Sequence, residues 1–267
     1  YDRNRYRTSR IEATAPDGTQ VPISLVHAAD VDPHAGPHPM ILYGYGAYGI
    51  TIDPAFSQSR VSLLDRGVVY AIAHVRGGGF LGRTWYEDGK FLKKQNTFID
   101  FVACARHLVS AGLTAPDRLA IWGGSAGGLL VGTALNLAPE LFRAALAAVP
   151  FVDIVTTMLD KSLPLTAAEW EEWGDPRQKE FFDAMAAYSP YDNVEAKTYP
   201  DVFAIAGLND PRVQFWEPAK WIAKLRQTAT GGEFLLLTHL GAGHQGRSGR
   251  YGALEDRALE HAWLLWK

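Results

Sequence analysis

The stretch Leu119–Gly127 (LAIWGGSAG) sets the fold that the rest of the sequence must fit. Its aliphatic start, 119–122, predicts a buried strand, and the run 126–137 that follows predicts a helix. Between them lies G-x-S-x-G, the setting in which a sharp strand-to-helix turn lifts a nucleophilic serine above a parallel sheet. Glycines are needed there because side chains would collide with neighbouring backbone. A glycine-rich turn that merely contains serine is the alternative, which this context disfavours.

Outward from this turn, apolar runs alternate with helical patterns. The expected strands are 40–43, 68–75, 119–122, 144–149, 202–206 and 234–238, and the expected helices are 96–110, 126–137, 218–228 and 253–266. Residues 11–26 alternate around Asp17-Gly18 and predict a β-hairpin. This order predicts one α/β domain, 1–267, with the α/β-hydrolase fold: a mostly parallel central sheet with helices on both faces.

The segment 159–199 interrupts the alternation. It is long, acidic and aromatic, without a clear strand. We expect a helical excursion over the carboxyl edge of the sheet, where ligands bind in folds of this kind.

Composition narrows the classes of partner. The chain has 267 residues, 47% of them hydrophobic, and a net charge of -3, which weighs against a nucleic-acid partner because such proteins usually present a basic face. Its single cysteine, Cys104, rules out an internal disulfide and fits a reducing, cytoplasmic location. No apolar stretch approaches the roughly 18 residues of a membrane span, so no membrane partner is expected.

A serine hydroxyl attacks only with a base in hydrogen-bond reach. In this architecture an acid and then a histidine follow the serine, each after a later strand. The strand 202–206 leads into Asp210, and the strand 234–238 leads into His244. We therefore predict Ser125, Asp210 and His244 as the catalytic triad, with activity that rises with pH through about 6.5, where an ordinary imidazole loses its proton.

Two rival residues are disfavoured by position. His239 lies at the end of its strand, with less freedom to reach over the sheet, and Asp201 precedes its strand and would lie at the wrong edge. The histidines show no metal-ligand spacing, so no metal is expected.

The stretch Gly44–Gly49 matches the dinucleotide-binding pattern G-x-G-x-x-G. A dinucleotide site needs a helix to begin there, whereas Ile50–Pro54 has no helical pattern and ends in proline. We therefore expect no cofactor. A glycine-lined loop beside the serine turn is better suited to supplying contacts to an oxyanion.

Four glycine-rich motifs resemble the catalytic domain of prolyl oligopeptidase-type serine peptidases: Gly44–Gly49, His74–Gly79, Gly123–Gly128 and Gly243-His244. Further stretches are similar to the oligopeptidase B branch: Pro150–Asp153, Thr156–Asp160, Ser189–Val194 and Trp216–Trp221. The resemblance covers nearly the whole chain. It implies the same triad, an oxyanion hole made by the Tyr45 hydroxyl and the Ala126 backbone N–H, and Arg212 as the residue that holds a substrate carbonyl.

The resemblance also bears on specificity. Glu169 stands where the prolyl-specific branch carries a tryptophan that stacks on proline, and a carboxylate pairs with a guanidinium or ammonium group instead. We therefore expect cleavage of short basic peptides after Arg or Lys, with Glu169 as main reader and Glu171 in support. Asp53 matches a position that the branch uses for a second basic residue. Without the resemblance, a solvated helix face would be the preferred interpretation of these glutamates.

The chain departs from the family pattern in three ways. Phe80 replaces a glutamate, which leaves the pairing of Arg76 open, and Gln245 replaces a glycine. The β-propeller that covers the active site in this family has no counterpart in the 267 residues, so we expect it elsewhere in the same protein. The alternatives are a carboxylesterase or acyl-peptide hydrolase with the same triad, and, more remotely, an inactive hydrolase-fold binding domain.

Overall fold

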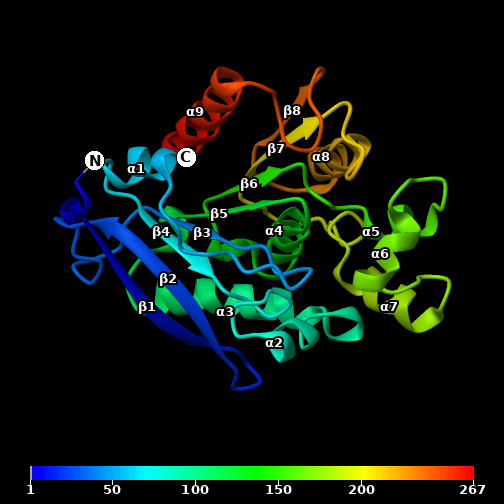
Figure 1. Cartoon of the computed structure of the whole chain (residues 1–267), viewed down its shortest axis with the longest axis horizontal. Helices are drawn as coiled ribbons and strands as arrows, with labels where there is room; N and C mark the ends of the chain where they lie inside the picture. The colour runs from blue at the N-terminus through cyan, green and yellow to red at the C-terminus, as the bar shows by residue number, and fades with distance from the viewer. Residues whose placement is uncertain (1) are drawn as a thin grey trace.

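Eight strands form a single sheet in the computed structural model, which describes residues 2–267 (Figure 1). Their order across the sheet is β1-β2-β4-β3-β5-β6-β7-β8. The strands are β1 (Tyr6–Thr14), β2 (Gln20–Ala28), β3 (Met40–Tyr43), β4 (Val69–Ala73), β5 (Leu119–Gly124), β6 (Ala144–Ala148), β7 (Asp201–Gly207) and β8 (Phe234–His239). β1 and β2 form the predicted hairpin, β2 is antiparallel to β4, and the other neighbours are parallel. The mostly parallel sheet is therefore confirmed.

Helices cover both faces of this sheet, with α3 and α4 on one face and α1 and α9 on the other (Figure 1). The α-helices are α1 (Gln58–Leu64), α2 (Arg83–Glu87), α3 (Gln95–Ser110), α4 (Ala126–Leu137), α5 (Ile154–Leu159), α6 (Thr166–Trp173), α7 (Lys179–Tyr188), α8 (Trp216–Thr228) and α9 (Arg250–Trp266).

The two faces explain why the central strands are continuously apolar. In β3, Leu42 packs with the core under α3 and α4, whereas its neighbour Ile41 packs with the core under α1 and α9. Ile121 and Ala120 in β5 divide in the same way. Because successive side chains of a strand point to opposite faces, a sheet covered on both faces needs apolar residues at every position.

Helix α4 lies against the sheet almost without exposed surface. Its glycines allow close approach: a Cβ on Gly128 would lie 2.4 Å from the Cβ of Pro150, and one on Gly132 would lie 2.7 Å from the Cβ of Pro190. Leu129, Leu130 and Val131 are fully buried. A helix that is apolar all round and packed this tightly holds its first residue, and the serine before it, in a fixed place.

The excursion after β6 is helical, as predicted, and consists of α5, α6 and α7. Figure 1 shows these helices beyond the ends of the central strands, on the side of the molecule away from α1 and β1. The sequence predictions missed the short helices α1 and α2 and began α9 three residues late, at 253 instead of Arg250. Within residues 2–267, every helix falls short of the length and apolar content needed to cross a membrane.

Candidate active site

Ser125 occupies a strained turn between β5 and α4. Its backbone angles, φ 55° and ψ -120°, lie in a region that non-glycine residues rarely adopt. A Cβ on Gly123 would lie 2.1 Å from the carbonyl oxygen of Gly127, and a Cβ on Gly127 would lie 2.7 Å from that of Gly44. Side chains at these two positions would open the turn, which is the physical reason for the G-x-S-x-G pattern.

His244 and buried Asp210 form a hydrogen-bonded pair. His244 follows β8 and Asp210 follows β7. His244 Nδ1 lies 2.7 Å from Asp210 Oδ2. The other carboxylate oxygen accepts the backbone N–H groups of Arg212, at 2.8 Å, and Val213, at 3.0 Å. Burial opposes ionisation of Asp210, but the hydrogen bonds from His244 and the two N–H groups outweigh it and lower the pKa of the carboxyl group. A charged Asp210 fixes the imidazole with its proton on Nδ1 and leaves Nε2 to act as a base.

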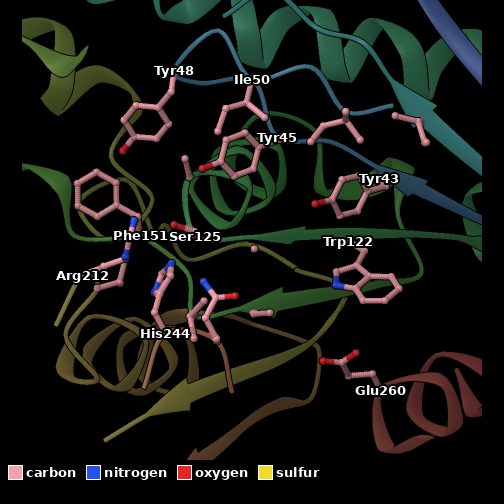
Figure 2. Close-up of a pocket in the computed structure, with 18 of the residues that line it drawn as sticks. Tyr43, Tyr45, Tyr48, Ile50, Trp122, Ser125, Phe151, Arg212, His244 and Glu260 are labelled. Atoms are coloured by element: carbon pink, nitrogen blue, oxygen red, sulfur yellow. The ribbon is translucent and has the colours of Figure 1, made fainter. Parts of the chain in front are cut away.

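Ser125 and His244 line the same cavity, whose volume is about 810 Å³. Figure 2 shows the serine and the imidazole pointing into the same part of it. In residues 2–267 no hydrogen bond joins the serine hydroxyl to this ring. Contacts of this kind are often long before substrate binds and tighten in the complex, so the arrangement fits the predicted roles of the two residues.

The rival residues lie elsewhere. His239 Nε2 is 3.2 Å from Asp256 on α9, and Asp201 pairs with Arg143 and Lys267 at the start of β7. Both positions agree with the choice of His244 and Asp210.

Two groups beside Ser125 suit an oxyanion. Tyr45 lines the cavity together with Ser125 (Figure 2), and burial raises the pKa of its hydroxyl to about 12, so the hydroxyl stays protonated and able to donate. The N–H of Ala126, at the start of α4, donates to no backbone acceptor within the described chain. An N–H group at a helix N-terminus favours a developing negative charge.

Of the acidic residues predicted to bind substrate, Glu169 is the one that lines the cavity within the described chain. Its Oε2 accepts hydrogen bonds from the Tyr48 hydroxyl, at 2.7 Å, and from Trp173 Nε1, at 3.0 Å. Of the described residues, those lining the cavity include neither Glu171 nor Asp53, and both of these side chains are exposed. Glu171 follows Glu169 by two positions, and residues two apart on a helix point in different directions.

Glu172 belongs to the same acidic group in the sequence, where it has no predicted role of its own. It is only 3% exposed, and it accepts the backbone N–H of Tyr48, at 2.8 Å, and the Tyr86 hydroxyl, at 2.6 Å. The sequence spacing indicates this position. Residues three apart lie on the same face of a helix, so Glu172, and not Glu171, lies on the same face of α6 as Glu169.

Arg212 lies at the cavity edge near Phe151 and His244 (Figure 2). The residue is exposed, and its guanidinium group makes no hydrogen bond or ion pair within residues 2–267. It is therefore accessible to a substrate carbonyl.

The departures at Phe80 and Gln245 have clear local outcomes. Arg76 pairs with Asp100, with Nη2 2.6 Å from Oδ1, and with Asp17, also at 2.6 Å, so its charge is compensated without a glutamate at position 80. Phe80 instead stacks on His74 with ring centroids 3.6 Å apart. Gln245 lines the cavity next to His244. In the part of the chain that the structure describes, no cluster of three or more His, Cys, Asp or Glu residues could hold a metal ion.

Comparison with known proteins identifies the family to which this chain is related. The model described as the prolyl oligopeptidase family matches residues 54–267. "Protease 2" from Moraxella lacunata is 52% identical over 268 residues, and the match covers 100% of this chain and 39% of that protein. "Dipeptidyl aminopeptidase BI" from Pseudoxanthomonas mexicana is 51% identical, and the match covers 99% of this chain and 37% of that protein.

Solved structures agree with these relatives. Oligopeptidase B from Leishmania major superposes with a TM-score of 0.97 at 50% identity, over 98% of this chain and 37% of that one. Oligopeptidase B from Trypanosoma brucei, with covalently bound antipain, gives 0.97 at 55% identity, over 99% of this chain and 38% of that one. The chain thus spans well under half the length of these relatives. The α/β-hydrolase fold and the predicted resemblance to oligopeptidase B are both confirmed, and the chain belongs to the prolyl oligopeptidase family.

Proposed function

We propose that this chain is the catalytic part of a serine peptidase that cleaves short peptides on the carboxyl side of Arg or Lys. The observation that carries the proposal is one cavity lined by Ser125, by His244 with its buried partner Asp210, and by the carboxylate of Glu169. A nucleophile with its base, and a group that selects a cationic side chain, thus face the same space.

The chemistry follows from the positions of these groups. His244 Nε2 takes the proton of Ser125 as the serine oxygen attacks the peptide carbonyl carbon. The Tyr45 hydroxyl and the Ala126 N–H donate to the oxyanion that forms, and Asp210 stabilises the imidazolium ion. His244 then gives the proton to the leaving amine, which departs and leaves an acyl-enzyme on Ser125. A water molecule attacks the ester in the same way and releases the acid.

Selection of Arg or Lys rests on Glu169. Tyr48 and Trp173 each donate a hydrogen bond to Oε2 of this carboxylate and fix its position. A carboxylate fixed in this way pairs with guanidinium or ammonium groups and offers nothing to an apolar side chain. Arg212 at the edge of the cavity would hold a carbonyl oxygen of the same peptide, and Asp53, in the exposed loop nearby, would attract a second basic residue.

The setting of the domain is part of the proposal. Because the chain spans 39% and 37% of the length of two relatives, we propose that a β-propeller in the same protein covers the cavity and admits only short peptides. We also propose a cytoplasmic location: Cys104 is a buried free thiol, and burial raises its pKa, as suits a thiol kept reduced.

Probe labelling followed by a substrate panel tests this function. A fluorophosphonate should label the protein at Ser125, located by peptide mass mapping, and blocked Arg and Lys amides should be cleaved ahead of blocked neutral amides. Turnover of neutral esters without amides would indicate a carboxylesterase, and release of N-acylated residues would indicate an acyl-peptide hydrolase. Release of dipeptides only from peptides with a free N-terminus would instead fit the name of the Pseudoxanthomonas relative. Absence of labelling in folded protein would indicate an inactive binding domain.

A further inference from the structure

The loop Gly44–Gly49, which carries Tyr45 to Ser125, has a strained backbone. Three of its residues have positive φ angles: Gly46 at 74°, Tyr48 at 60° and Gly49 at 64°. For a bulky side chain such as that of Tyr48 this conformation is unusual, and it persists only where the surroundings hold it in place. The position of the Tyr45 hydroxyl therefore depends on what holds the loop.

Two buried charged side chains hold it. Lys94, 2% exposed, donates from Nζ to the carbonyl oxygen of Gly46 at 2.5 Å. Glu172, 3% exposed, accepts the N–H of Tyr48 through Oε1 at 2.8 Å. Between these two bonds lies Ala47, whose side chain is fully buried. The strained segment is thus fixed on both sides by groups from the start of α3 and from α6.

The charge of Glu172 favours the charged form of Lys94. Burying a single charge is costly, and an opposite charge close by reduces that cost. Burial lowers the pKa of Lys94 to about 8, and the charge of Glu172 acts in the opposite direction. Lys94 Nζ also lies 5.0 Å from the ring centroid of Trp173, the residue after Glu172, which adds a cation–π contact.

The loop Gly44–Gly49 also contacts Glu169, the residue proposed to select Arg or Lys. The Tyr48 hydroxyl and Trp173 Nε1 both donate to Glu169 Oε2. The rings of Tyr48 and Trp173 meet edge to face, with centroids 5.7 Å apart. Contacts therefore run without a break from Lys94 and Glu172 to the Tyr45 loop in one direction and to Glu169 in the other.

We propose that Lys94 and Glu172 are positioning residues that align the oxyanion donor Tyr45 with the specificity carboxylate Glu169. This inference rests on the proposed function, because it assigns the two residues to the same reaction. Neither of them touches the serine or the substrate. Their effect is to keep two parts of the site, from separate segments of the chain, at a fixed spacing.

The test measures kcat and KM for an Arg ester and a neutral ester in Lys94→Met and Glu172→Gln. Displacing an oxyanion donor lowers the rate of the chemical step, so we expect kcat to fall by about 10- to 100-fold on both esters. KM for the neutral ester should stay within about threefold of the original value, because no group that binds this substrate is removed. The exposed residues Lys93 and Glu180 supply matched controls: Lys93→Met and Glu180→Gln should leave both constants within about twofold.

Two further variants separate positioning from folding. The double variant Lys94→Met/Glu172→Met replaces the buried pair by apolar side chains of similar length, an exchange that commonly preserves the fold. It should lose kcat as the single variants do, per active site counted by fluorophosphonate titration. Tyr48→Phe keeps the N–H bond to Glu172 and removes the hydroxyl bond to Glu169, so it should raise KM for the Arg ester more than for the neutral ester.

The outcomes distinguish the inference from the function it rests on. Unchanged kcat in folded Lys94→Met, Glu172→Gln and the double variant, beside an active original protein, overturns the positioning role alone. An original protein that is neither labelled nor active overturns the proposed function and the positioning role with it. A kcat loss on both esters in the three variants, with the two control variants unaffected, supports the proposal.

Discussion

Two histidines at the carboxyl end of β8 pair with carboxylates, and only His244 lies where it can serve a nucleophile. His244 Nδ1 lies 2.7 Å from Asp210, whose side chain is fully buried and held by two backbone N–H groups. His239 Nε2 lies 3.2 Å from Asp256, at 14% and 15% side-chain exposure, and Asp256 also binds Arg247 at 2.8 Å. Asp256 shares its charge with the permanent cation of Arg247, and within the described chain His239 does not line the cavity of Ser125. Contact between a histidine and a carboxylate therefore does not make a base; an unshared charge and a nucleophile in the same cavity are also needed.

The largest test of this comparison removes one histidine at a time. His244→Ala should lower kcat for an Arg amide by about a million-fold, because the members of a triad act as a unit. His239→Ala should keep kcat within about threefold of the original value. Steady-state kinetics on both proteins, with folding checked by circular dichroism, measures the difference. Equal losses in the two variants would reverse the assignment of the base.

The carboxylates give the next largest contrast. Asp210→Asn keeps the shape of the side chain but removes the charge that fixes the imidazole tautomer, so kcat should fall by about 10⁴-fold. Asp256→Asn should change kcat by less than threefold. The same kinetic assay checks both variants, and a loss of under tenfold in Asp210→Asn would show that another group orients His244.

The next comparison is between two acidic residues of α6, Glu169 in the wall of the cavity and exposed Glu171. Glu169→Ala should lower kcat/KM for Arg substrates by roughly 30-fold or more, since loss of one partner from a desolvated charge pair costs about 2–5 kcal/mol. Exposed Glu171 is the matched variant, and Glu171→Ala should have a much smaller effect. The ratio of kcat/KM for Arg and neutral esters measures both. A loss under threefold in folded Glu169→Ala would remove Glu169 from this role.

The sequence predicts some of these contrasts and not others, for physical reasons. Helix α4 was predicted with its observed bounds, Ala126–Leu137, because the apolar pattern and the serine turn define both ends. The positions of Asp210 and His244 followed from chain order and strand ends. Helix spacing alone places Glu172 on the face of Glu169, but the burial of Glu172 did not follow from the sequence, because it depends on which face of α6 packs against Tyr48. The positive φ of Tyr48 gives no local sequence signal, since tertiary contacts impose it.

The smallest expected effect is the pH dependence of kcat/KM, which tests most directly which group acts as the base. Because the hydrogen bonds of Asp210 outweigh its burial and lower its pKa, this carboxylate stays charged below the usual range of an aspartate, and its contribution to stability is lost only as the pH falls through that lowered value. Protonation of the base therefore limits activity first. Because the base acts only when neutral, kcat/KM should fall by up to tenfold per pH unit as the pH is lowered through the range where the base takes up its proton, while circular dichroism stays constant.

Glu217 and Glu260 also titrate near neutral pH and must be separated from the base. Burial raises the pKa of Glu217 to about 7 and that of Glu260, in the cavity wall, to about 6. If His244 is the group observed, the rise in kcat/KM should persist in Glu217→Gln, in Glu260→Gln and in His239→Ala. Its disappearance in either glutamine variant would assign the titration to that glutamate, and its disappearance in His239→Ala would transfer the role of base to the pair that Arg247 partly neutralises.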